Sequence, residues 1–116
     1  MKHYKNLDSA PFRAIESGEK TIELRLNDEK RRALKVGNEI ELSCAGVGYT
    51  LIATVKELHR FTDFKELFAA LPLDKCGYNG REKEADPDDM LKYYTEENIK
   101  KYGALGIELE NVKVCL

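Results

Sequence analysis

The sequence predicts an α+β fold, in which a sheet of about five short strands carries short flanking helices. Apolar and polar residues alternate at 20–26, 39–44, 49–59 and 105–109, which is the period of a strand with one buried face. Between these segments, apolar residues recur three or four positions apart in short runs. Such runs begin near Ser, Thr or Asp and end at Gly or Pro, as helices do.

Length and composition limit the classes of protein to consider. The chain has 116 residues, and we expect a single domain over residues 1–116 with one modest core. Charged residues make up 34% of the chain, but their signs nearly cancel and the formal net charge is −2. Binding a nucleic acid along its whole phosphate backbone needs many Lys and Arg on one surface, so only a local contact is plausible here.

The cysteine and histidine content argues against metal and disulfide chemistry. Cys44, Cys76 and Cys115 are far apart in the chain, and His3 and His59 have no neighbouring residues that would complete a ligand set. We therefore expect no metal and no cofactor. No apolar run approaches the roughly 20 residues of a membrane span, and the N-terminus lacks the apolar core of a signal peptide. We expect a cytoplasmic protein that makes no membrane contact.

The first part of the chain combines an uncertain segment with a clear helix and strand. Residues 1–7 are ambiguous, although their apolar side chains can pack at the edge of a barrel. Asp8 or Ser9 can cap a helix, which Gly18 ends because glycine readily takes the left-handed conformation. Residues 20–26 are then expected to form a strand.

The middle of the chain predicts a pair of strands joined by a turn. Residues 27–35 are expected to form a short helix or loop, and Gly37-Asn38 a turn. Residues 39–44 and 49–59 alternate as strands, with a glycine-containing hairpin connection between them. The longer strand is partly apolar on both faces, which suits a closed barrel.

The last part of the chain is expected to be less regular. Thr62 or Asp63 caps a helix that Pro72 ends. The segment Leu73–Asp89 contains glycines and an acidic run, and we predict a long surface loop, a kind of loop that is often functional or mobile.

A short helix and the final strand complete the prediction. Asp88 or Asp89 is expected to cap a short helix through Tyr94. Thr95 opens another helix that ends at Gly103. The strand at 105–109 follows, and residues 112–116 complete or follow it.

The most informative stretch runs from Ser17 to Arg32. Within the strand, Glu23 and Arg25 lie two residues apart and therefore side by side on one face. The strand leads into the densest basic cluster of the chain, which consists of Lys30, Arg31, Arg32 and Lys35. The pattern alone leaves two interpretations open. One is a binding site, and the other is a solvated strand face whose ion pair contributes about 0–1 kcal/mol.

The residues Gly18, Lys20, Glu23 and Arg25 match a family signature. Their spacing resembles the GxKxxExR motif of the ASCH family, a relative of the PUA fold. The turn at 36–38 and the segment 102–109 are also similar to that family's turn and closing strand. The resemblance covers most of the chain and implies a small PUA-like β-barrel of about five strands with short flanking helices.

The resemblance implies an RNA- or nucleotide-binding module with its cleft beside the motif. In that function, Arg25 would contact a phosphate or a base edge, Glu23 would orient Arg25 or accept from an exocyclic amine, and Lys20 would contact a phosphate. Further contacts along the RNA backbone would come from Lys30, Arg31 and Arg32. Several tyrosines could either stack on unpaired bases or pack within the protein, namely Tyr49, Tyr78, Tyr93 and Tyr94.

Two alternatives remain open. One branch of the family hydrolyses the amide of N4-acetylcytidine with a lysine, a threonine and a glutamate, and Lys20 falls at that lysine. Glu23 occupies the threonine's place, and Lys20 and Glu23 would be catalytic only in this alternative. Several acidic residues compete for the glutamate's role, namely Asp88, Asp89 and Glu96. The second alternative is a protein-interaction or accessory domain, which the net negative charge and the acidic loop fit.

Overall fold

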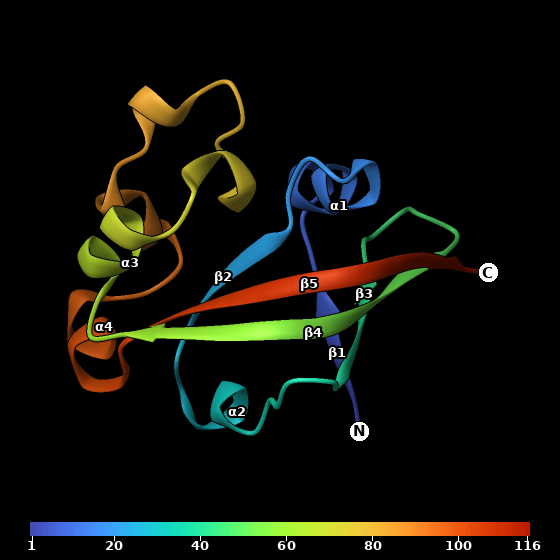
Figure 1. Ribbon diagram of the computed structural model, residues 1–116, viewed down its shortest axis with the longest axis horizontal. Helices are drawn as coiled ribbons and strands as arrows, with labels where there is room; N and C mark the ends of the chain where they lie inside the picture. The colour runs from blue at the N-terminus through green and yellow to red at the C-terminus, as the bar shows by residue number, and fades with distance from the viewer.

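The computed structural model describes all of residues 1–116 and contains one five-stranded sheet (Figure 1). The strands are β1 (Lys2–Asn6), β2 (Ile22–Leu26), β3 (Glu39–Ser43), β4 (Thr50–Phe61) and β5 (Ala104–Cys115). They lie in the order β1-β3-β4-β5-β2, with β1 parallel to β3 and the other pairs antiparallel. The sheet curls into a half-barrel, and β1 and β2 are its two edge strands. The predicted α+β, PUA-like fold is confirmed.

Short helices surround this sheet. The α-helices are α1 (Ser9–Ser17), α2 (Glu29–Arg32), α3 (Phe64–Ala70) and α4 (Glu96–Tyr102), and the 3₁₀ helices are η1 (Leu73–Cys76), η2 (Glu82–Glu84) and η3 (Pro87–Lys92). As predicted, α1 ends at Gly18, whose φ of 85° is left-handed. Side-chain oxygens of Asp28, Asp63 and Thr95 cap α2, α3 and α4. None of the helices is long and apolar enough to cross a membrane.

The ambiguous N-terminal segment forms the edge strand β1. Its backbone pairs in parallel with β3, where Lys5 lies opposite Leu42. Because side chains alternate along a strand, Lys5 shares the inward direction with Leu7, and both are buried. The last strand is also longer than predicted, since β5 continues without a break from the expected strand into residues 112–115.

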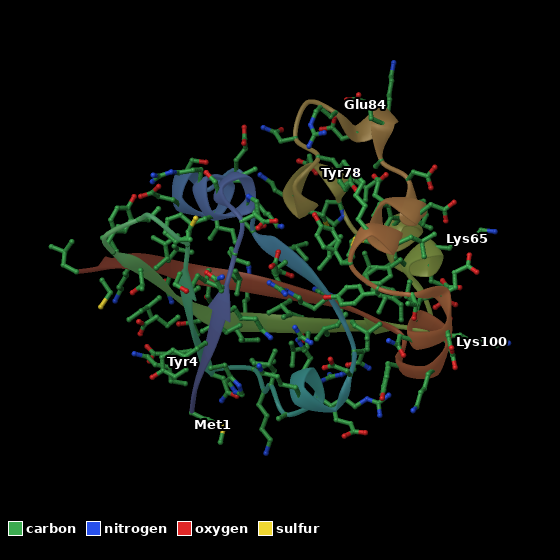
Figure 2. All side chains as sticks on the ribbon, turned by 180° about the vertical axis from the view of Figure 1, so that it is seen from behind. Met1, Tyr4, Lys65, Tyr78, Glu84 and Lys100 are labelled. Carbon is green, nitrogen blue, oxygen red and sulfur yellow. The ribbon has the colours of Figure 1, made fainter.

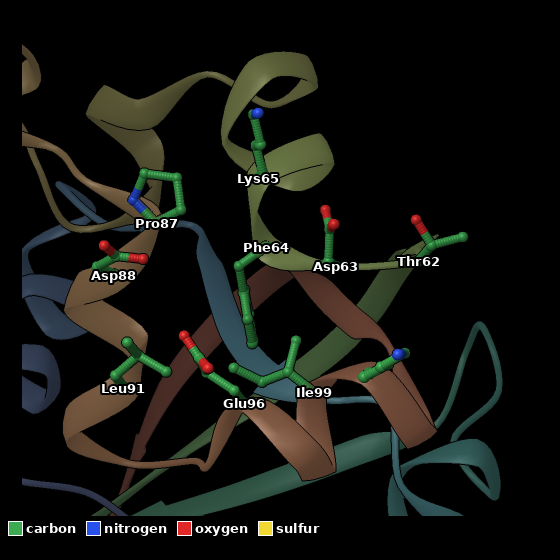
Figure 3. A pocket seen from close by; sticks show the side chains of 10 residues that line it. Thr62, Asp63, Phe64, Lys65, Pro87, Asp88, Leu91, Glu96 and Ile99 are labelled. Carbon is green, nitrogen blue, oxygen red and sulfur yellow. The ribbon is translucent and has the colours of Figure 1, made fainter.

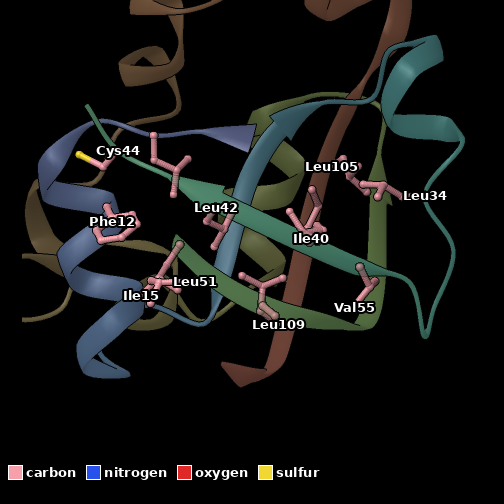
Figure 4. Close-up of a cluster of buried hydrophobic side chains, with 13 residues drawn as sticks. Phe12, Ile15, Leu34, Ile40, Leu42, Cys44, Leu51, Val55, Leu105 and Leu109 are labelled. Atoms are coloured by element: carbon pink, nitrogen blue, oxygen red, sulfur yellow. The ribbon is translucent and has the colours of Figure 1, made fainter. Parts of the chain in front are cut away.

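The buried apolar side chains form two clusters. The larger cluster lies between α1 and the inner face of the sheet and includes Phe12, Ile40 and Leu51 (Figure 4). The second cluster joins β2 to α3, η1 and η3 through residues such as Leu24, Leu67 and Cys76. Strand β2 therefore has buried residues on both faces, which fixes its position firmly.

The segment Leu73–Asp89 differs from the predicted surface loop. It contains η1, η2 and the start of η3, and the Cys76 side chain is only 3% exposed. Its helix η3 is capped by Asp86, not by Asp88 or Asp89 as predicted. The reason is Pro87, whose fixed φ suits the first position of a helix and places the cap one residue before it.

Candidate functional site

The motif residues of β2 form a three-membered charge cluster. The ammonium Nζ of Lys20 lies 2.7 Å from Oε1 of Glu23. The other carboxylate oxygen, Oε2, accepts hydrogen bonds from Nε and Nη2 of Arg25 at 3.1 and 2.8 Å. Both oxygens of Glu23 are therefore occupied, and its charge is shared between two cations.

Burial of this cluster excludes the solvated-face interpretation. Glu23 is 7% exposed, and the Lys20 and Arg25 side chains are also largely buried. Burial by itself would raise the pKa of Glu23, but the charges and hydrogen bonds of Lys20 and Arg25 outweigh it and hold that pKa below its ordinary value. Burial would lower the pKa of Arg25, and Glu23 and the nearby Tyr94 instead raise it. Glu23 and Arg25 are therefore both charged at neutral pH.

The segment from η1 onward covers Lys20. The backbone N–H of Thr21 donates to the carbonyl of Lys75 at 3.0 Å, and the side-chain amide of Asn79 donates to Glu19 at 2.8 Å. A Cβ atom placed on Gly77 would lie 3.8 Å from the Lys20 ammonium. In Figure 2, the labelled Tyr78 and Glu84 mark this segment, which rises beside β2. The segment from η1 onward therefore packs against the start of the motif.

A fourth charged group, Lys5, reaches the same region from β1. Lys5 is 8% exposed and forms no ion pair or side-chain hydrogen bond. Burial and, less strongly, the charges of Arg31, Arg25 and Lys30 together lower its pKa from 10.5 to about 8, against a weaker opposing effect of Asp28. The cations of β1, β2 and α2 are therefore close enough to repel one another. Figure 2 shows side chains filling the space between the β1 and β2 ribbons.

The two arginines of the basic cluster after β2 bond to different parts of the fold. Arg31 donates from Nη1 to Asp28 at 2.6 Å, while its Nε is buried and donates to no acceptor. Lys30 is exposed, although its charge acts on Lys5. Arg32 turns away toward α4, where its guanidinium donates to the carbonyl of Tyr102 at 3.3 Å. The charge of Arg31 therefore acts on Lys5, whereas Arg32 is directed toward α4.

Sequence reasoning missed Lys5 as a member of this cluster. The segment 1–7 gave no clear strand pattern, because the side chains of β1 are mostly polar and exposed. The available signal was the alternation of Lys5 with the apolar Leu7, which puts both on the buried face. A second unsatisfied group, Oδ1 of Asn27, is buried directly after β2. Unsatisfied buried polar atoms are uncommon in native proteins, and each calls for an explanation such as a bound water or ion.

The residues that compete for the hydrolase's glutamate are engaged elsewhere. Asp89 accepts a hydrogen bond from the hydroxyl of Tyr78 at 2.7 Å and one from the N–H of Asp86. Asp88 and Glu96 line a pocket of about 430 Å³ between α3, η3 and α4 (Figure 3). Neither this pocket nor a second one beside β3 is lined by a residue of the motif.

The tyrosines considered for base stacking have separate environments. Tyr94 lies parallel to Phe64 at 6.2 Å between ring centroids, and Tyr78 packs edge-on against Phe68. Tyr49 bonds to residues of α1. Only Tyr93 is widely exposed, at 65%.

The two histidines make ordinary polar contacts. Nε2 of His59 lies 2.9 Å from Oε1 of Glu108, and Nε2 of His3 lies 3.1 Å from Oδ1 of Asn38. No group of three or more His, Cys, Asp or Glu side chains is arranged to hold a metal ion.

Comparison with solved structures identifies the same fold over nearly the whole chain. The hypothetical protein PH0355 is 30% identical, with a TM-score of 0.77 over 95% of this chain and 98% of that one. The protein PF0455 from Pyrococcus furiosus is 29% identical, with a TM-score of 0.71 over 95% of this chain and 96% of that one. An ASCH protein from Zymomonas mobilis is 18% identical, with a TM-score of 0.65 over 97% of this chain and 69% of that one, and this likeness shows the fold alone.

The family comparison covers strand β2 and the motif that it carries. No protein of curated function matches the chain. The family model described as the ASCH domain matches residues 6–113, which is most of the sequence and includes the GxKxxExR motif. The chain therefore belongs to the ASCH family.

Proposed function

We propose that this ASCH protein binds RNA or a nucleotide through the charge cluster at β2. The observation that carries the proposal is the local excess of positive charge. Four cations, Lys5, Lys20, Arg25 and Arg31, face only two carboxylates, Glu23 and Asp28. This excess occurs in a chain whose formal net charge is −2, so it is a local property and not a consequence of composition.

The geometry supports distinct roles for the motif residues. Glu23 holds Lys20 and Arg25 in place with both of its oxygens, so we assign it a positioning role and not direct contact with a base. Arg25 is the residue that we expect to contact a phosphate or a base edge, because a guanidinium offers several donors in a fixed plane. The exposed Lys30 would add a contact to the backbone of a longer RNA.

Hydrolysis receives less support from the same contacts. The threonine of the N4-acetylcytidine hydrolases supplies a hydroxyl, whereas Glu23 at that place is an ion-paired carboxylate. A lysine that acts as a base or nucleophile needs its nitrogen free, whereas Nζ of Lys20 is bound to the Glu23 carboxylate at 2.7 Å. A binding role needs neither change.

The experiment is a binding titration with a short single-stranded RNA, followed by fluorescence anisotropy at low salt. The Arg25→Lys variant keeps the charge but loses the planar fork, and we expect its affinity to fall about tenfold, or roughly 1.4 kcal/mol. The matched control is Arg60→Lys, since Arg60 is exposed on β4. Equal affinities of wild type, Arg25→Lys and Arg60→Lys would refute the assignment of Arg25. A release of cytidine from N4-acetylcytidine that is lost in Lys20→Ala would favour the hydrolase instead.

A further inference from the structure

We infer that Lys5, Arg25 and Arg31 form a phosphate-binding subsite between the two edge strands of the half-barrel. The inference deepens the proposed function, on which it rests, by naming the chemical group that the cluster receives. It also adds Lys5, a residue outside the family motif, to the binding surface. The ligand class that follows is a nucleotide or a phosphate-bearing end of RNA, and not a neutral nucleoside.

The first argument is the cost of keeping Lys5 where it lies. A buried ammonium without a counter-ion is unfavourable, and native proteins normally pair or expose such a group. Lys5 is 8% exposed and makes no ion pair, and the charges that act on it most strongly are those of the cations Arg31, Arg25 and Lys30. Leu7, two residues further along and directly after β1, is also buried, which shows that an apolar side chain is readily accommodated here. A bound anion would compensate the charge and explain why a lysine occupies this position.

The second argument is the unused hydrogen-bonding capacity of the cluster. A lysine ammonium has three N–H donors, and those of Lys5 have no partner in the structure. The Nε of Arg31 is buried and donates to no acceptor. Arg25 is the third member, and only one oxygen of Glu23 engages its guanidinium. Several donors from different directions match the oxygens of a phosphate.

The third argument is the charge balance. Asp28 neutralises one guanidinium, and Glu23 is shared by Lys20 and Arg25, so two positive charges remain uncompensated even when the exposed Lys30 is not counted. A phosphate monoester carries about −1.5 to −2 charges at neutral pH, which balances this excess. A neutral nucleoside would leave it unchanged. The charged groups that face Lys5 are Arg25, Lys30 and Arg31 as cations and Asp28 as the acid.

The three elements that supply these residues come together only in the folded chain. β1 and β2 are opposite edges of the sheet, and α2 follows β2 directly. Figure 1 shows α2 below the space between the ribbons of β2 and β1. A phosphate at this place would therefore link the two sheet edges through charge.

The test compares nucleoside 5′-monophosphates with the corresponding nucleosides and with inorganic phosphate, by calorimetry on the full chain. The wild-type protein should bind at least one monophosphate about tenfold or more tightly than its nucleoside. The Lys5→Met variant removes the charge and should lose that difference. The matched control is Lys2→Met, because Lys2 is on the same strand but pairs with Glu41 at the surface.

The side chain of Lys5 offers a second readout. Carbon NMR of the lysine side chains should show the pKa of Lys5 rising when inorganic phosphate binds, whereas that of Lys2 should not move. Because methionine replaces an uncompensated buried charge, Lys5→Met should fold at least as well as wild type, which thermal unfolding checks.

The possible outcomes separate the subsite from the proposed function. If RNA binds with shifts at the motif but Lys5→Met keeps the full preference for monophosphates, the phosphate subsite is wrong and the binding function stands. If inorganic phosphate shifts Lys5 while no RNA or nucleotide binds, the subsite stands and the proposed function fails. If neither RNA nor phosphate affects Lys5 or the motif, both are overturned.

Discussion

Nζ of Lys20 lies 2.7 Å from Oε1 of Glu23, and this contact is almost closed to solvent. The opposite oxygen of the same carboxylate bonds to Arg25. The motif therefore acts as one unit, in which a single acid fixes two bases at the edge of the sheet. Removing the acid leaves two buried cations without a counter-charge, whereas removing one base leaves the acid still paired.

We predict that Glu23→Gln lowers the free energy of unfolding by on the order of 3–5 kcal/mol, because breaking a buried ion pair leaves uncompensated charge. Urea unfolding at pH 7 measures the change. The control is Glu110→Gln, since Glu110 is exposed on β5 and makes no ion pair, and its effect should stay within about 0.5 kcal/mol. Similar values for the two variants would contradict the buried pairing.

The same carboxylate gives a pH dependence of known sign. The pKa of Glu23 is lower in the folded protein than its ordinary value of 4.5. Its stabilising contribution is therefore complete above about pH 4.5 and is lost as the pH falls through the folded-state pKa. Wild type should lose stability in this acid range more steeply than Glu23→Gln. Parallel acid profiles for the two proteins would show that Glu23 does not titrate with a lowered pKa.

Lys5 should produce the opposite behaviour at alkaline pH. Its pKa of about 8 lies below the ordinary value of 10.5, so the unfolded chain binds this proton more tightly than the folded protein does. Stability should rise between about pH 8 and 10.5, as the folded protein sheds an unfavourable charge. The full change is on the order of 3 kcal/mol. Lys5→Met should be more stable than wild type at pH 7 and lose this alkaline increase, which denaturant unfolding at several pH values measures.

Two adjacent arginines should differ in RNA binding. Arg31 joins the cluster through Asp28, whereas Arg32 turns toward Tyr102. If RNA binds as proposed, Arg31→Gln should weaken binding and reduce the slope of log affinity against log salt by about 0.7, the value for one phosphate contact with a single strand. Arg32→Gln should change neither quantity. A reversed order of the two effects would place the RNA on the α4 side instead.

The hydroxyl of Tyr78 should hold the covering segment in place. Tyr78 directly follows Gly77, the glycine that packs on Lys20, and its hydroxyl donates to Asp89 at 2.7 Å. Tyr78→Phe should cost about 0.5–1.5 kcal/mol and speed hydrogen exchange of amides between Gly77 and Glu84. Tyr93→Phe is the control, because that hydroxyl lies on an exposed ring. Unchanged exchange in Tyr78→Phe would show that the hydrogen bond does not order the segment.

Local patterns in the sequence predicted most of the fold. Alternation marked β2 through β4 and the first part of β5, and caps such as Asp63 and Thr95 marked helix starts where the structure has them. These features depend on neighbouring residues, so a single sequence reveals them. The segment Leu73–Asp89 was misjudged because its packing depends on contacts with β2, such as the one between Lys75 and Thr21. Such contacts have no local signal.

The candidate site was predictable only in part, for the same reason. The side-by-side arrangement of Glu23 and Arg25 follows from strand geometry, but their burial follows from the elements packed over β2. The approach of Lys5 depends on how the sheet curls and brings its two edges together. The divergence of Arg31 and Arg32 depends on where α4 ends, which the sequence of α2 does not encode.

The most direct test of the central claim is an amide-shift map of labelled protein titrated with a short single-stranded RNA that carries a 5′-phosphate. The account predicts shifts concentrated at Lys5, at the motif from Lys20 to Arg25, and at Arg31. It also predicts that the shifts at Lys5 weaken when the RNA lacks the terminal phosphate. Shifts confined to the pocket between α3 and α4, or no shifts at any of these residues, would contradict it.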